Sequence, residues 1–228
     1  MKSADKHRKI IRAAIKVFAK KGFFNARISD IAKEAKVADG TIYLYFNNKF
    51  DILLSVFEQE IGKLIEQVVL LLDKEENPRR KLEIFIANHL EEMKRNKYLA
   101  EVIHIELRQT SKLIREYRKN KFSEYLDIIA TIIDTGQQAG IFRPDIQPEI
   151  AKQLIFGALD EVSRICNIGK DHPYTIEEVS RQLTATFLEG MLAPQSESLR
   201  PDFPPSRPTL QAANRTGSVR RPELSRFF

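Results

Sequence analysis

The sequence of 228 residues has few of the residues that interrupt or cross-link a chain. It contains only 9 glycines, no tryptophan and one cysteine, Cys166. A single cysteine excludes a disulfide within the chain and fits a reducing compartment. Because glycine is scarce over long stretches, many short strands joined by tight turns are not expected, and helices are favoured.

Signals for membranes, secretion and catalysis are also missing. No apolar run approaches the roughly 20 residues that a membrane span needs, and the charged start MKSADKHRKIIRAAIK does not resemble a secretory signal. There is no glycine-rich phosphate loop, no cluster of metal ligands and no Ser/His or Cys/His pair in recognisable surroundings. We expect a soluble cytoplasmic protein that has no membrane partner, is not an enzyme and uses no metal or cofactor.

Charge is distributed unevenly along the chain. Residues 1–50 hold 12 Lys and Arg against 4 Asp and Glu, whereas residues 51–193 hold 19 against 24. The last 35 residues hold 6 against 3. An ordinary solvated basic face is one explanation of the N-terminal excess. A basic module on an acidic body is also the electrostatic pattern of a nucleic-acid reader.

Apolar residues recur at spacings of three and four through most of the chain, which predicts an all-α fold. Gly22 is expected to end the first helix, and Asn77 followed by Pro78 to begin another. Six of the 10 prolines fall in residues 194–228, where the apolar periodicity stops, so we expect a disordered tail there. Nine helices are expected, at 3–21, 28–35, 40–46, 49–73, 78–95, 97–108, 111–139, 148–168 and 175–192.

Residues 28–50, ISDIAKEAKVADGTIYLYFNNKF, have the pattern of two short helices joined by a tight turn, followed by the start of a third. Ile31, Ala32 and Ala35 share one face of the first helix, and Ile42 and Phe46 of the second can pack against it. The remaining face of the second helix carries hydroxyls and aromatic rings, with Lys49 just beyond its end. Such a helix suits insertion into a DNA major groove.

This region resembles the DNA-binding domain of the TetR family of bacterial repressors, through AAIKVFAKKGFFNARISDIAKEAKVADGTIYLYFNNKFDIL. Two positions depart from the family pattern, because Arg27 and Ala38 stand where many members have Thr or Ser. Ala38 cannot cap a helix, so we expect Asp39 to do so and the third helix to begin one residue later. Leu44 can contact a thymine methyl group but cannot form a hydrogen bond with a base.

The resemblance implies a nine-helix TetR-type fold and a homodimer that binds a double-stranded DNA operator. It implies a helix-turn-helix domain over 1–48, a ligand-binding and dimerisation domain over 49–193, and a dimer interface built from the helices at 148–168 and 175–192. Gly157 and Ala158 would allow close approach there; the alternative is that both helices pack within one subunit. The expected DNA-binding residues are Arg27, Gly40, Thr41, Tyr43, Leu44, Tyr45 and Lys49.

The blocks ADGTIYLYF, NKFDIL, ELRQTSKLIREYRK and KQLIFGALDEV resemble the FadR-type fatty-acid-degradation regulators within this family. That resemblance implies a small hydrophobic effector, long-chain acyl-CoA, whose binding releases DNA. Basic residues near the site would bind the CoA phosphates, and Lys152 is one candidate. The expected ligand-binding residues are Phe85, Ile86, His89, Leu90, Ile103, Leu107, Arg108, Gln109, Arg115, Phe122, Leu126 and Phe156.

Several alternatives remain at this point. The middle helices could form a plain core, and each histidine or arginine could be a core residue or a member of a surface ion pair. A different apolar effector is also compatible with the sequence. A TetR-type repressor of a multidrug efflux pump would need acidic or aromatic side chains turned inward, such as Glu101, Glu106, Asp160 or Glu161.

Overall fold

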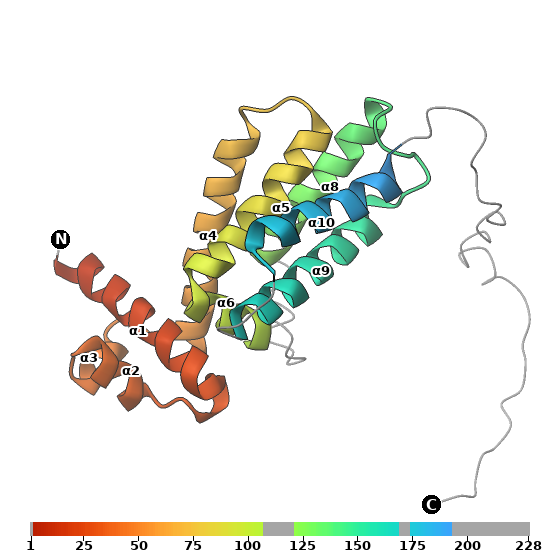
Figure 1. Cartoon of the computed structure of the whole chain (residues 1–228). Coiled ribbons are helices and arrows are strands. Elements are labelled where there is room, and N and C mark those ends of the chain that lie inside the picture. The colour runs from red at the N-terminus through yellow and green to blue at the C-terminus, as the bar shows by residue number, and fades with distance from the viewer. Residues whose placement is uncertain (1, 107–120, 169–173, 193–228) are drawn as a thin grey trace, which may run out of the picture. The chain divides into compact units, whose positions relative to one another are not determined.

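The computed structural model describes residues 2–106, 121–168 and 174–192, and the regular structure within these ranges is helical (Figure 1). The predicted all-α class is therefore confirmed. None of the described helices is long and apolar enough to cross a membrane. The helices are α1 Lys2–Asn25, α2 Ile28–Ala35, α3 Asp39–Tyr43, α4 Lys49–Leu72, α5 Pro78–Arg95, α6 Lys97–Glu106, α8 Lys121–Gln138, α9 Pro148–Ile168 and α10 Ile176–Met191.

Helices α1, α2 and α3 form a small core at the N-terminal end of the chain. Ile10 and Phe18 of α1, Ile31 of α2, and Ile42 and Phe46 in and after α3 are all buried. The helical geometry of α1 is interrupted at Gly22, whose φ of 70° and ψ of 160° lie in a region that glycine adopts without steric cost. The predicted break at this position is thus observed, although helical hydrogen bonding resumes up to Asn25.

The start of α3 differs from the sequence-based expectation. Its N-cap residue is Ala38, the helix begins at Asp39, and no side chain caps its first turn. The prediction that Asp39 caps the helix is wrong, because Ala38 already adopts the extended conformation of a cap residue with φ −73° and ψ 149°. Asp39 instead lies in the first turn, where a negative charge is favoured by the helix dipole.

Caps at the other helix starts follow the sequence closely. The Asn48 side chain accepts a hydrogen bond from the Asp51 amide at the start of α4, and Asn77 accepts one from Arg79 before α5. Thr175 and Glu178 form a reciprocal capping box at α10. These caps satisfy amide groups that the first helical turn leaves without partners.

Helix α5 runs through the middle of the second group of helices, in contact with α4, α6, α8, α9 and α10 (Figure 1). Its side chains Leu82, Phe85, Ile86 and Leu90 are fully buried. Two helices of this group also contact α1, namely α4 and α6. Helices α1 to α3 are therefore joined to the second group both through the chain at α4 and through packing of α6 against α1.

Candidate DNA interface and effector site

The exposed side of α3 carries the side chains expected to contact DNA. Tyr43 is 59% exposed and Leu44 is 79% exposed, whereas Ile42 between Thr41 and Tyr43 is buried. Gly40 has open space around the position of a Cβ atom, and Thr41 is half-buried. The helix thus divides into a packed face and a projecting face, as the spacing predicted, and contact of the projecting face with DNA stays a prediction.

Tyr45 projects less than expected, because it is half-buried and lies 6.1 Å from the ring of His7 in an edge-on arrangement. His7 also stacks on Phe46 at 4.9 Å and contacts Gln59 of α4 through its Nδ1 atom. This histidine therefore ties the start of α1 to the end of α3. Nothing near His7 in the chain indicates these partners, so the sequence assigned it no role.

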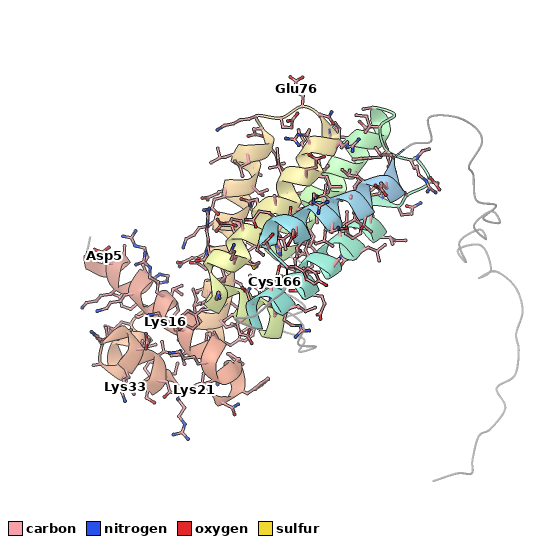
Figure 2. The ribbon with its side chains drawn as sticks, viewed as in Figure 1. Asp5, Lys16, Lys21, Lys33, Glu76 and Cys166 are labelled. Carbon is pink, nitrogen blue, oxygen red and sulfur yellow. The ribbon has the colours of Figure 1, made fainter. Side chains whose placement is uncertain are left out.

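The helices α1 and α2 carry many basic side chains, but several are already paired. Lys16 of α1 bonds to Glu34 of α2 at 3.2 Å, and Lys21 bonds to Asp30 at 2.7 Å. Figure 2 shows Lys16, Lys21 and Lys33 on the N-terminal helices. Arg27 is exposed just before α2, where its backbone N–H donates to the Asp30 carboxylate. Its side chain remains suited to a phosphate contact.

Lys49 has a structural role that the sequence did not reveal. Its Nζ atom donates to the backbone oxygens of Phe24 at 3.0 Å and Ala26 at 2.8 Å, and it lies 4.6 Å from the centre of the Phe23 ring. These contacts fix the start of α4 against the connection between α1 and α2. Contact of this lysine with a phosphate stays a prediction, but its ammonium group already joins α4 to the segment between α1 and α2.

We expect Lys49→Met to lower the free energy of unfolding by about 2 kcal/mol, since two hydrogen bonds from a charged donor and a cation–π contact are lost. Urea unfolding followed by circular dichroism measures this change. The matched control is Lys33→Met at an exposed position of α2. Its free energy of unfolding should change by no more than about 0.5 kcal/mol. Equal stability of the two variants would contradict the structural role of Lys49.

The predicted effector residues that lie in the described ranges come together in the second helix group. Their elements are α5, α6, α8 and α9, and all the side chains are buried except Phe156, which is partly buried. Phe122 and Phe156 contact edge-on at 5.0 Å, and Phe85 lies 5.1 Å from Tyr125. These rings form an aromatic wall among α5, α8 and α9. Leu107, Arg108, Gln109 and Arg115 lie outside the described residues.

His89 of α5 lies within this wall. Its ring contacts Phe156 edge-on at 5.8 Å, and its Nδ1 atom is 3.0 Å from the hydroxyl of Tyr125. Burial lowers the pKa of His89 to about 4 and raises the pKa of Tyr125 above its usual value. Both groups are therefore neutral near pH 7. Tyr125 is not among the residues expected to bind the ligand, so its bond to His89 is a new feature of the site.

A second buried polar pair joins α6 to α9. The Nδ1 atom of His104 bonds to the Asp160 carboxylate, and both side chains are almost fully buried. Asp160 also acts electrostatically on His89, favouring its protonated form, although burial outweighs this effect on the pKa. His104 and Asp160 are 56 residues apart, so no local spacing could indicate the pair.

One cation suggested for the CoA phosphates is used elsewhere. The Lys152 ammonium is buried and bonds to Asp127 at 2.6 Å and to Glu149 at 2.5 Å. Because both neighbours are carboxylates, they raise the pKa of Lys152 and keep it charged in spite of burial. The suggestion that Lys152 binds phosphate is therefore not supported. Its role is to join α8 to α9.

Helix α9 exposes an apolar stripe. Ile150 and Leu154 are 61% and 62% exposed, and Ile165 is also exposed, as is Tyr174 shortly before α10. Gly157 lies between them, with open space at its Cβ position. A hollow of about 620 Å³ adjoins the stripe, lined by residues from the end of α9 and by α10. A stripe of this length on one helix is unusual for a surface that stays in water.

Comparison with known proteins identifies the family. Residues 10–56 match bacterial regulatory proteins of the tetR family, and residues 57–190 match the C-terminal region of YsiA-like proteins. The fatty acid metabolism regulator protein of Bacillus subtilis is 34% identical over 186 residues, covering 82% of this chain and 95% of that protein. The chain belongs to the TetR family of bacterial transcriptional regulators.

Solved structures agree with this assignment. The structure of FadR from Bacillus subtilis in complex with stearoyl-CoA is 34% identical, with a TM-score of 0.74 over 80% of this chain and 98% of that one. FadR from Bacillus halodurans gives 33% identity and the same TM-score and coverage. The predicted resemblance to FadR-type regulators is confirmed, and these relatives are regulators rather than enzymes.

Proposed function

We propose that this protein is a homodimeric repressor of fatty-acid degradation genes that leaves its operator when it binds long-chain acyl-CoA. The single observation that carries the proposal is the buried aromatic wall of α5, α8 and α9, in a chain similar over most of its length to a FadR solved with stearoyl-CoA. A flexible acyl chain needs an elongated apolar environment, and this wall supplies one.

Residues 1–48 would read DNA and residues 49–193 would bind the effector and dimerise. Arg27, Thr41, Tyr43, Tyr45 and Lys49 would mostly bind phosphates, and Gly40 would let the helix backbone approach the DNA. Leu44 cannot form a hydrogen bond with a base, so specificity would lean on thymine methyl contacts and on DNA shape. The protein would act in the cytoplasm, where a bacterial operator lies.

The exposed apolar stripe on α9, with α10 beside it, supports a dimer interface over 148–168 and 175–192. Two copies related by a twofold axis would cover the stripe with its own equivalent. Dimerisation would place two recognition helices about 34–36 Å apart, so that they enter successive major grooves.

The effector would act by shifting the dimer between two states. One state would hold the recognition helices at operator spacing, and the other would bind acyl-CoA more tightly, because a ligand with equal affinity for both shifts nothing. Helices α4 and α6 both contact α1, so movement of either helix would displace the DNA-reading helices.

The efflux-pump alternative is less well supported by the buried charges. Of the acids proposed to face a cationic drug, Asp160 is bonded to His104, and Glu161 is bonded to Arg164 on the surface of α9. A drug cation would have to displace a partner from either carboxylate. A neutral acyl chain needs no such exchange.

A gel shift with the DNA upstream of the protein's own gene tests the proposal. The dimer should retard this fragment, and stearoyl-CoA at micromolar concentration should release it, whereas a cationic dye should not. CoA without an acyl chain is the matched control, since it has the phosphates but lacks the apolar part. Release by the dye and not by any acyl-CoA would favour the efflux-pump alternative.

A further inference from the structure

Two buried imidazole rings inside the sensing helices each have one nitrogen without a partner. His89 is 2% exposed and His104 is 4% exposed. The Nδ1 atoms bond to Tyr125 and Asp160, but neither Nε2 atom has a hydrogen-bond partner within the described part of the chain. A buried polar atom without a partner loses the hydrogen bond that it would form in water, so such an atom calls for an explanation.

The surroundings of His89 determine which of its nitrogens carries the proton. The hydroxyl of Tyr125 holds its proton firmly, because burial raises the pKa of this phenol. Among the described residues, Nδ1 of His89 is the one hydrogen-bond partner of this hydroxyl, so the hydroxyl proton is satisfied only if Nδ1 is an unprotonated acceptor. Since the ring is neutral, its single proton lies on Nε2. His89 thus presents a neutral N–H donor in the interior.

The negative charge of nearby Asp160 limits which ligand groups can accept a hydrogen bond from His89. Asp160 lies close enough to act electrostatically on His89, and its carboxylate is held in place by His104. In an apolar interior, a second carboxylate near Asp160 would be repelled strongly. A neutral carbonyl oxygen could accept from His89 without this repulsion.

The wall around the donor is apolar and aromatic. Phe156 meets the His89 ring edge-on and contacts Phe122 in turn, while Phe85 lies against Tyr125 one helical turn before His89. One donor in an aromatic wall matches a ligand that is mostly hydrocarbon and carries one acceptor. An acyl thioester has this composition, with its carbonyl at the junction between chain and headgroup.

We propose that Nε2 of His89 donates a hydrogen bond to the thioester carbonyl oxygen of the acyl-CoA effector, and that Asp160 excludes free fatty acids from the same position. This inference rests on the proposed function and adds to it. It makes the protein a sensor of the activated thioester, which is the form of a fatty acid committed to metabolism, rather than of the acid itself.

Three ligands test the inference with the unaltered dimer. Stearoyl-CoA has the carbonyl, S-octadecyl-CoA is a thioether without it, and stearate carries a carboxylate. We expect calorimetry to give about 10-fold weaker binding of the thioether, in line with the loss of one buried hydrogen bond. Stearate should bind at least about 100-fold more weakly than stearoyl-CoA, because it also lacks the headgroup and meets Asp160.

Substitutions distinguish the contribution of the His89 N–H group from that of the surrounding aromatic rings. His89→Phe keeps an aromatic ring but has no N–H, so it should bind the thioester and the thioether with equal affinity. The matched control is Phe85→Leu on the same helix, which should weaken both ligands by a similar factor and keep their ratio near 10. Tyr125→Phe removes the hydroxyl that determines the tautomer of His89. This variant should reduce the ratio of thioester affinity to thioether affinity to about 3.

The outcomes distinguish this inference from the proposed function. Equal binding of thioester and thioether by the unaltered protein, or an unchanged ratio in His89→Phe, overturns the role of His89 while acyl-CoA remains the effector. Tight binding of stearate overturns the role of Asp160. Absence of binding by both CoA ligands overturns the proposed function, and this inference with it. The comparison of ligands on the unaltered protein stands even if a variant fails to fold.

Discussion

Replacing Tyr43 by alanine should weaken operator binding by about 100-fold or more while leaving the fold intact. Tyr43 lies on the projecting face of α3 and is 59% exposed, so its ring contributes little to the core. Loss of a specific protein–DNA contact costs about 1–3 kcal/mol. Because a dimer loses this contact in both half-sites, the loss of binding free energy is doubled.

The measurement is a gel-shift titration at fixed salt concentration, since phosphate contacts depend strongly on ionic strength. Tyr98→Ala on α6 is the matched control, because Tyr98 is also an exposed tyrosine but lies outside the recognition helix. Its operator affinity should stay within about twofold of the unaltered protein. Unchanged affinity of the Tyr43 variant would show that α3 is not the reading helix.

Placing charges in the α9 stripe should produce a monomer that no longer binds the operator. In the double variant Leu154→Glu with Ile165→Glu, each charge appears twice across a twofold interface and has no partner there. Burying an unpaired charge costs several kcal/mol. We therefore expect the dissociation constant of the dimer to rise at least about 1,000-fold.

Light scattering after size-exclusion chromatography gives the mass of the variant, and a gel shift gives its DNA binding. Leu70→Glu is the matched control, because Leu70 on α4 is 64% exposed but lies outside the stripe. This control should remain a dimer and bind DNA normally. A dimeric double variant would contradict the interface and would show that α9 serves another purpose.

Much of the fold could be predicted because its signals are local. Asn77 followed by Pro78 fixed the start of α5, and Thr175 with Glu178 fixed the start of α10, since both caps involve residues within one helical turn. The division of α3 into a packed and an exposed face was predicted in the same way, from the spacing of Ile42 and Phe46 against their polar neighbours. The bounds of this helix were misplaced, because α3 ends at Tyr43 rather than at residue 46, and because its cap is a backbone conformation of Ala38 and not a side chain.

The amino-acid sequence by itself determined that this protein is helical, that its N-terminal part resembles the DNA-binding domain of the TetR family, and that its middle helices are apolar. The tertiary structure alone decided the partners of the polar groups. Lys49 bonds to backbone oxygens more than 20 residues away, His104 meets Asp160 across two helices, and Lys152 is held by Asp127. Helical periodicity assigns a residue to a face, but only the packing of helices distant in the chain brings a particular donor to a particular acceptor.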